Sequence, residues 1–416
     1  MKRHLLKFLS ALLLPLAALL LPLSTMPVLS APNDLVAQTG DAHYAPIALP
    51  NSAADPNSPP PELAKVPIAL LIDLSSGQTL YAKEPDRRFV PASITKVMTL
   101  YTAFELIKHR HIKPEQRLRM SLSAFKDWDH VGSTMFLDPT MNPSINDLLL
   151  GIANVSANDA CIVLAEGAAG SVPNWTALMN GQARRLGMKN SHFGTPNGWM
   201  DEGETFVSAL DLTKLAEAMI VGHPDFYHRY VGHETLSWNG ITQYNHDPIL
   251  GRIEGADGIK TGFTNQSGFG YLGTAQRGGR RLVMVVAGAS RKHERDAAAR
   301  ALMNWGFAAF SSQPIFAAGQ TIGEAKVQGG TDRHVNLVTP SGFAASMPMD
   351  TKDPVSMRIV YDGPLEAPVE KGSIVAALEI RIGKKAPHRV PLVAGESVGR
   401  GGWLARLRDG LFGIVT

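Results

Sequence analysis

The chain has 416 residues, of which 44% are hydrophobic and 19% are charged, and its formal net charge is +3. These values are ordinary for a globular protein of two or three domains, and the low net charge argues against a nucleic-acid partner. The single cysteine, Cys161, excludes an intramolecular disulfide and argues against a cysteine-based zinc site. It lies in an apolar run, so we expect a small buried hydrophobic residue.

The first 31 residues have the pattern of a secretory signal peptide. A positively charged start precedes a Leu/Ala-rich run over 8–23, and small residues at Ser30 and Ala31 suit a cleavage site. The alternative is a retained membrane helix, which two prolines within the run disfavour. Residues 32–63 are rich in Pro, Asn, Ser and Ala and predict a flexible linker. We therefore expect an exported, periplasmic protein.

Residues 64–312 predict a first folded domain. Apolar runs over 68–74 and 78–82 read as a pair of strands. Apolar residues then recur at helical spacing in four segments, 94–104, 148–155, 175–186 and 210–219, and a further helix follows Ser156. After Gly258 two strand-like segments flank a turn at 277–280, and a helix over 294–310 closes the unit. Strands at both ends with helices inserted between them indicate an α+β fold.

The remaining chain predicts two further parts. Short alternating segments over 313–395 indicate a small all-β domain of the sandwich type. Residues 400–416 predict an amphipathic helix with these residues on its apolar face: Trp403, Leu404, Leu407, Leu411, Ile414 and Val415. This helix is too short to span a bilayer, and we expect it to lie on the outer surface of the cytoplasmic membrane. The alternative is a helix packed on the β domain.

A serine followed by a lysine suggests the first part of a catalytic site. A nucleophilic serine needs a base, a route for its proton and a site for the oxyanion. In Ser93-Ile-Thr-Lys96 the two residues share a helix face, so the Lys96 amine can reach the Ser93 hydroxyl. A position at the start of a helix also places the positive end of the helix dipole beside the developing oxyanion.

Two further motifs follow in the chain. Ser156-Ala-Asn158 offers a hydroxyl that can pass a proton to a leaving amine and an amide that can hold a substrate backbone. Lys260-Thr261-Gly262 lies on a predicted strand and offers a positive charge and a hydroxyl. Its glycine leaves room for the close approach of an extended peptide.

Each motif is weak by itself. The SxxK pattern recurs at Ser123–Lys126 and the SxN pattern at Ser144–Asn146 and Ser237–Asn239, whereas KTG occurs once. A helix-capping serine beside a surface lysine is the simpler explanation of an isolated SxxK. The order SxxK, SxN, KTG and the context of each motif select Ser93 and Ser156 over the other copies. Ser93 begins an apolar helix directly after two strands, and Ser156 lies between two apolar helices.

With these motifs in this order, the chain resembles the low-molecular-mass penicillin-binding proteins, which are serine-type D-alanyl-D-alanine carboxypeptidases. The resemblance runs from about residue 66 to 310 and includes PASITKVMT, GSTMFLDP, SANDACIVLAE, LGMKNSHFGTPNG and GIKTGFT. It implies the penicillin-binding and β-lactamase-like transpeptidase fold, an antiparallel sheet with inserted helices. Ala157, Thr140 and Phe263 stand where relatives often carry other residues, which leaves substrate preference and deacylation rate open.

The resemblance also implies a reaction. Lys96, kept neutral by burial beside Lys260, would deprotonate Ser93, which would attack the carbonyl between the two terminal D-alanines of a peptidoglycan stem pentapeptide. Backbone N–H groups of Ser93 and Phe263 would form the oxyanion hole. Ser156 would pass the proton to the departing D-alanine, and water would hydrolyse the acyl-enzyme. β-Lactams would acylate the same serine.

Substrate binding is implied in the same way. Thr261 and Arg295 would bind the terminal carboxylate, and Asn158, Lys260 and Gly262 would complete the substrate-binding set. No metal and no cofactor is implied. Three alternatives remain open: a D,D-endopeptidase on the same fold, a β-lactamase, and a non-catalytic wall-associated protein. A β-lactamase would need a fast deacylation base, and no clear Glu-x-x-x-Asn loop supplies one.

Overall fold

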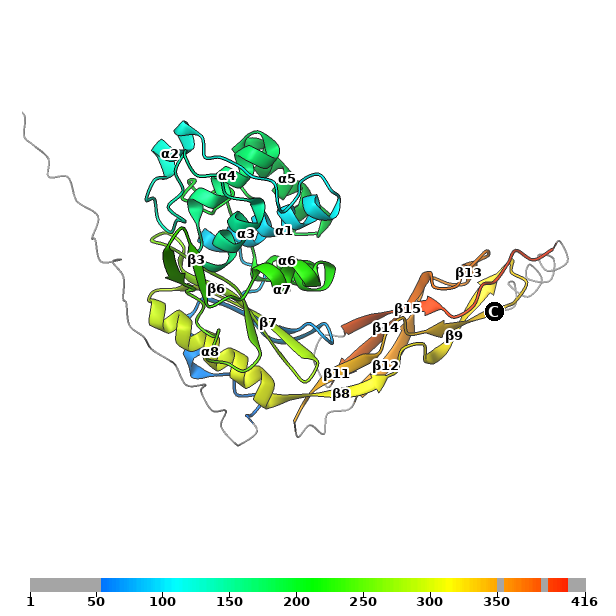
Figure 1. Cartoon of the computed structure of the whole chain (residues 1–416). Helices are drawn as coiled ribbons and strands as arrows, with labels where there is room; N and C mark the ends of the chain where they lie inside the picture. The colour runs from blue at the N-terminus through cyan, green and yellow to red at the C-terminus, as the bar shows by residue number, and fades with distance from the viewer. Residues whose placement is uncertain (1–53, 350–354, 383–387, 403–416) are drawn as a thin grey trace, which may run out of the picture. The chain divides into compact units, whose positions relative to one another are not determined.

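The computed structural model describes residues 54–349, 355–382 and 388–402 (Figure 1). The predicted signal peptide and all but the first three residues of the predicted C-terminal helix lie outside these ranges. Within them, no helix combines the length and the apolar character needed to cross a membrane.

The centre of the first domain is a five-stranded sheet in the order β2-β1-β7-β6-β5, and every neighbouring pair is antiparallel. Its strands are β1 (Ile68–Asp73), β2 (Gln78–Lys83), β5 (Ala256–Thr264), β6 (Gly268–Arg277) and β7 (Arg280–Ala289). Of the first two described strands, β1 therefore pairs with β7 of the last hairpin and β2 pairs with β1, and the helices are inserted between the two groups of strands. This arrangement confirms the α+β prediction. It also leaves β5, which carries the KTG motif, at one edge of the sheet.

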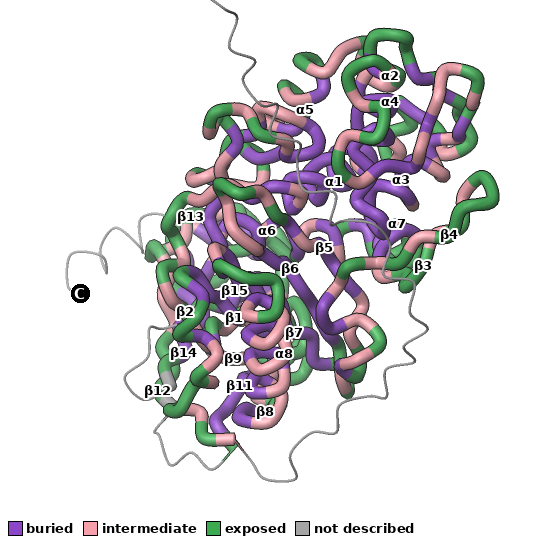
Figure 2. The backbone as a smooth tube through the Cα atoms, turned by 90° about the vertical axis from the view of Figure 1, so that its left-hand side faces the viewer, coloured by how far each residue is buried: buried purple, intermediate pink, exposed green. Residues whose placement is uncertain are grey.

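Alternating side chains bury both faces of this sheet. In β1, Leu70 packs into the core of the helical side and Leu71 into the core on the opposite side. In β7, Val285 packs into the core of the helical side and Met284 into the core on the opposite side. One long helix, α8 (Lys292–Ala309), covers the second face, as Figure 1 shows. Because both faces are covered, the middle of β7 (282–287) is a continuous apolar run, and Figure 2 shows most of the central strands as buried backbone.

The helical side consists of the inserted segments. A short 3-10 turn, η2 (Ala92–Thr95), leads into α1, and the other helices follow in chain order. They are α1 (Lys96–Lys108), α2 (Leu122–Trp128), α3 (Ile145–Asn154), α4 (Asn158–Ala169), α5 (Val172–Arg185), α6 (Ala209–Gly222) and α7 (Pro224–Tyr230). Helices α1 and α3 to α6 were expected from their apolar spacing. Helices α2 and α7, of seven residues each, are too short to show that periodicity and were missed.

One element of this domain was not predicted, and one predicted boundary needs correction. The chain between α7 and β5, for which no element was predicted, forms a hairpin of β3 (Thr235–Trp238) and β4 (Ile241–Tyr244) around Asn239-Gly240. Both turn residues have positive φ, the conformation that an Asn-Gly turn favours. The predicted linker also ends earlier than residue 63. A 3-10 helix, η1 (Pro61–Lys65), buries Leu63, and the Trp305 indole N–H donates to the Asp55 carbonyl at 3.0 Å.

The C-terminal domain is all-β, as predicted. A six-stranded sheet in the order β12-β14-β15-β10-β9-β13 accompanies the two-stranded sheet β11-β8. The strands are β8 (Phe310–Phe316), β9 (Thr321–Gln328), β10 (His334–Val338), β11 (Phe343–Pro348), β12 (Val355–Val360), β13 (Leu365–Glu366), β14 (Ile374–Ile382) and β15 (His388–Ala394). Strand β8 begins directly after α8, three residues before the predicted boundary at 313, so the two domains share no linker.

Candidate active site

The serine of the SxxK motif lies in a tight turn rather than in an α-helix. Ser93 is part of the 3-10 turn Ala92–Thr95, and the α-helix begins at Lys96, which corrects the expectation that Ser93 starts the helix. Ala92 has a φ of +48°, so the chain turns sharply immediately before the serine. The i, i+3 spacing is retained, because a 3-10 turn also places such residues on one side.

Two glycines pack tightly against this turn. A Cβ added to Gly262 of β5 would lie 2.3 Å from the Pro91 carbonyl oxygen. A Cβ added to Gly198 would lie 1.9 Å from the carbonyl oxygen of Ala92. Both glycines therefore allow an approach that no other residue permits, and they hold the Ser93 turn between β5 and the loop before α6.

The amine of Lys96 has three acceptors around it. Its Nζ lies 2.9 Å from Ser93 Oγ, 2.8 Å from Asn158 Oδ1 and 2.7 Å from the Asn197 carbonyl oxygen. The side chain is fully buried, and this burial lowers the pKa of Lys96 to about 8. A neutral amine donates two N–H bonds and retains one lone pair. With Asn158 and Asn197 accepting those bonds, the lone pair is directed at the Ser93 hydroxyl proton.

A second buried lysine lies beside the first. Lys260 of β5 is 5% exposed, and its Nζ donates to the Thr261 carbonyl at 3.2 Å. Burial and, to a smaller extent, the positive charge of Lys96 lower the pKa of Lys260 to about 7. Two amines in one buried space disfavour the doubly protonated state, so this geometry keeps one lysine neutral near neutral pH.

The SxN motif lies at the junction of α3 and α4, as its context predicted. Ser156 is 5% exposed and has a φ of +63°. The Asn158 amide is held at both ends, because Oδ1 accepts from Lys96 and Nδ2 donates to the Val131 carbonyl at 2.9 Å. One of the two Nδ2 protons remains for a substrate carbonyl. The amide therefore orients the lysine in addition to the expected substrate contact.

The edge of β5 presents the remaining predicted residues. Thr261 is half-buried, and Phe263 is 47% exposed with its ring stacked on Phe269 at a centroid distance of 4.0 Å. Arg295, in the first turn of α8, is 3% exposed. Its Nη1 donates to the Gly270 carbonyl at 3.0 Å and its Nε to Asp296 Oδ1 at 2.5 Å. The guanidinium is thus fixed against β6, one strand in from the edge.

Comparison with known proteins agrees with this geometry. Residues 56–291 match the D-alanyl-D-alanine carboxypeptidase family, and residues 310–400 match the penicillin-binding protein 5 C-terminal domain. The chain belongs to the D-alanyl-D-alanine carboxypeptidase family.

Individual relatives extend over most of the chain. The D-alanyl-D-alanine carboxypeptidase DacD of Salmonella typhimurium is 35% identical over 86% of this chain and 94% of its own length. Penicillin-binding protein 5 of Haemophilus influenzae has a similar crystal structure, with 31% identity, a TM-score of 0.73, and coverage of 82% of this chain and 99% of that one. Penicillin-binding protein D2 of Listeria monocytogenes, solved in an ampicillin-bound form, covers 58% of this chain and 97% of its own at 27% identity and a TM-score of 0.53.

The structure separates the carboxypeptidase motifs from their duplicates. Ser123 and Lys126 are both exposed on α2. Ser144 caps α3 in a reciprocal capping box with Asp147, and Ser237 lies in the exposed β3–β4 hairpin, where its hydroxyl contacts Thr242. These duplicates have ordinary structural roles, and only the Ser93 set converges on buried lysines.

Two groups at the carboxypeptidase site were not predicted. The carbonyls of Asn197 and Val131 hold Lys96 and Asn158 respectively. Asn197 belongs to LGMKNSHFGTPNG and Val131 immediately precedes GSTMFLDP, and both segments contributed to the family resemblance. That resemblance was the only signal for them, because a backbone carbonyl has no side-chain signature.

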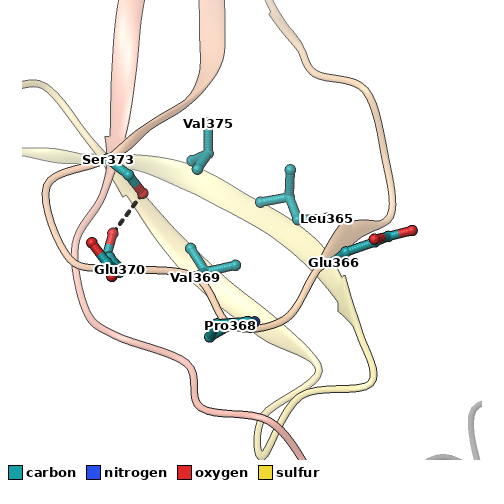
Figure 3. Close-up of a pocket in the computed structure, with 7 residues that line it drawn as sticks. All are labelled: Leu365, Glu366, Pro368, Val369, Glu370, Ser373 and Val375. Carbon is teal, nitrogen blue, oxygen red and sulfur yellow. Dashed lines mark hydrogen bonds between the residues drawn. The ribbon is translucent and has the colours of Figure 1, made fainter.

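A hollow of about 290 Å³ lies in the C-terminal β domain and not at Ser93. Figure 3 shows the residues that line it, Leu365, Glu366, Pro368, Val369, Glu370, Ser373 and Val375. Its only side-chain hydroxyl, that of Ser373, donates to the Glu370 carbonyl at 2.6 Å. The lining contains no lysine or histidine that can act as a base for this hydroxyl, so the hollow does not compete with Ser93 as a nucleophile site.

Proposed function

We propose that this protein is a serine-type D-alanyl-D-alanine carboxypeptidase, which removes the terminal D-alanine from peptidoglycan stem pentapeptides through an acyl-enzyme on Ser93. The observation that carries the proposal is the 2.9 Å contact between Lys96 Nζ and Ser93 Oγ, with the other two directions of the amine filled by Asn158 and Asn197. The family relationship supports the substrate class.

The reaction begins with proton transfer. Neutral Lys96 takes the hydroxyl proton of Ser93 as Oγ bonds to the scissile carbonyl carbon. The oxyanion accepts from the backbone N–H groups of Ser93 and Phe263. The proton then passes by way of Ser156 to the departing amine as the peptide bond breaks and D-alanine leaves. Water hydrolyses the resulting ester, which restores Ser93 and releases the shortened peptide.

The substrate binds as an added strand at the free edge of β5. Edge strands recognise extended peptides through main-chain hydrogen bonds, and Gly262 leaves the backbone of this edge accessible. The positive charge of Lys260, the Thr261 hydroxyl and Arg295 select the terminal carboxylate. Gly270 and Asp296 occupy two of the five N–H donors of Arg295, so three remain for the carboxylate.

Acylation should have a bell-shaped dependence on pH. The active form has Lys96 neutral and Lys260 protonated, so the pair holds one proton. Because Lys260 has the lower pKa, this is the less populated of the two one-proton forms, but its share of them does not change with pH. Burial lowers the pKa of these amines to about 8 and about 7, respectively. We expect the second-order rate constant for acylation by benzylpenicillin to peak between these two pKa values. Below and above that pH range it should fall about tenfold per pH unit. A rate that stays constant from pH 6 to 9 would contradict this assignment.

The proposal is tested with two compounds. Purified protein is incubated with a fluorescent penicillin and, separately, with a pentapeptide ending in D-Ala-D-Ala. We expect a covalent label on Ser93, located by peptide mapping, and release of free D-alanine. The ampicillin-bound Listeria monocytogenes protein supports the first expectation. If neither label nor D-alanine appears, the proposal is wrong. Cleavage of cross-linked dimers without release of D-alanine would instead identify the alternative, a D,D-endopeptidase.

We also propose that the enzyme is exported and lies on the outer surface of the cytoplasmic membrane. The signal-like N-terminus and the amphipathic pattern of residues 400–416 support this location. A membrane-held enzyme suits the trimming of stem peptides near the bilayer. Deleting residues 401–416 should move the mature protein from the membrane fraction to the soluble fraction. Unchanged sedimentation with membranes would contradict the role of the tail.

A further inference from the structure

Two buried tyrosines hold the peptide immediately before the KTG motif. The Tyr227 hydroxyl of α7 donates to the Asp257 carbonyl at 2.9 Å, and the Tyr271 hydroxyl of β6 lies 2.9 Å from the Gly258 carbonyl oxygen. Both phenol side chains are at most 1% exposed. The two carbonyls belong to consecutive residues, and Lys260 follows two positions later.

A carboxyl group joins the second of these contacts. The Tyr271 hydroxyl lies 2.8 Å from Asp247 Oδ2 and 2.9 Å from Oδ1. Oδ1 also accepts the N–H groups of Ile249 and Leu250 at 2.8 and 2.9 Å. Tyr271 has only one hydroxyl proton, yet the Gly258 carbonyl and the Asp247 carboxyl are both at hydrogen-bond distance from it.

A proton on Asp247 resolves this conflict. The Oδ2–H then donates to the Tyr271 oxygen, Tyr271 donates to the Gly258 carbonyl, and Oδ1 accepts the two backbone N–H groups. If Asp247 were ionised, the phenol proton would turn to the carboxylate and Gly258 would lose this donor. Burial favours the neutral acid and raises the pKa of Asp247.

The charges around Asp247 come from several elements. Lys260 of β5 and Arg295 of α8 are cations whose fields reach it, and Tyr227 and Tyr271 supply the phenols. The nearby carboxylate of Asp257 is neutralised by Arg281 at 2.8 Å. A change in the protonation of Asp247 therefore affects Lys260, the lysine proposed to hold the catalytic charge.

We propose that Asp247 and Tyr271, with Tyr227 beside them, are positioning residues: a neutral carboxyl donates to Tyr271, and the two phenols fix the start of β5. Tyr271 also lies opposite Thr261 in the β5–β6 ladder, so the same residue supports the carboxylate-binding part of the strand. This inference rests on the proposed function, since it concerns the placement of Lys260 and of the Phe263 N–H in that reaction.

The first test removes single hydroxyl groups. Tyr271→Phe should lower the second-order rate constant for acylation by benzylpenicillin about 10- to 100-fold, because small displacements of reacting groups have effects of that size. Tyr230→Phe is the matched control. Among the described residues, the buried Tyr230 hydroxyl has no hydrogen-bond partner, so its loss should leave acylation unchanged. Equal rates for the two variants would overturn the proposal.

The second test separates positioning from a purely structural role by measuring acylation against pH. Tyr271→Phe removes a phenol that can donate to a carboxylate, so the buried Asp247 stays protonated in this variant. We therefore expect the acylation rate to fall while the ascending limb of the pH–rate profile stays at its wild-type pH. With Asp247→Asn alone, we expect the ascending limb of the pH–rate profile to stay at its wild-type pH, because the amide N–H replaces the acid O–H as donor to Tyr271.

The contrary outcomes are distinct. If the ascending limb of Asp247→Asn moved to lower pH, Asp247 would be ionised in the wild type, and the proposal would be overturned. A lower melting temperature of Tyr271→Phe with an unchanged acylation rate would reduce Tyr271 to a structural residue, which also overturns the proposal. If the wild-type protein is not acylated at all, the proposed function fails. A reactive wild type with unaffected variants refutes only this inference.

Discussion

Lys96→Ala should lower the rate constant for acylation by benzylpenicillin about 10³-fold or more, because general-base catalysis contributes effects of this order. The substitution removes the only amine within hydrogen-bond distance of Ser93 Oγ among the described residues. It also releases Asn158 Oδ1 and the Asn197 carbonyl, so the oxygens that orient the base remain without their donor. The measurement is stopped-flow or gel-based acylation with labelled penicillin.

The second SxxK motif of the chain provides the control for this prediction. Lys126 has the same spacing from Ser123 as Lys96 has from Ser93, but it is exposed on α2. Lys126→Ala should therefore react at the wild-type rate and unfold at the wild-type temperature, since isolated surface substitutions change stability by about 0.5 kcal/mol or less. If the two lysine variants lost activity equally, Lys96 would not be the base.

The comparison of the two SxxK motifs shows how far the sequence predicts this site. Order and context selected Ser93 over Ser123, and the structure places Ser93 against the buried Lys96, which interacts with the buried Lys260, while Ser123 lies on the surface. Apolar periodicity also predicted the strands of the central sheet and the longer helices. These signals are strong because the apolar residues of a buried face recur over several helical turns or several residue pairs of a strand.

What the sequence did not predict depends on backbone groups and on short elements. The carbonyls that hold Lys96 and Asn158 belong to Asn197 and Val131, and any residue type presents the same carbonyl. The 3-10 turn at Ser93 continues the apolar pattern of α1, so spacing does not distinguish it from a helix. The β3–β4 hairpin did have a signal, the Asn239-Gly240 dipeptide, but no strands were predicted beside it.

The second large effect is expected at Gly198, which packs against the nucleophile turn from the loop before α6. Gly198 has a φ of +74°, and an added Cβ would lie 1.9 Å from the Ala92 carbonyl oxygen and 2.7 Å from Thr95 Oγ1. Gly198→Ala therefore combines an unfavourable backbone conformation with a clash that backbone atoms must move to relieve. We expect a loss of about 3 kcal/mol in unfolding free energy and an acylation rate lowered about 100-fold or more.

Gly187 separates these two causes. It has a similar φ of +65°, but no atom lies within 4 Å of the position of an added Cβ. Gly187→Ala should therefore cost only the left-handed conformation, about 1 kcal/mol, and should leave acylation unchanged. Denaturant unfolding and labelled-penicillin kinetics of the two variants measure both effects. If Gly198→Ala and Gly187→Ala were equally stable and equally active, the close contact of the Gly198 loop with the Ser93 turn would not be needed to hold the nucleophile in place.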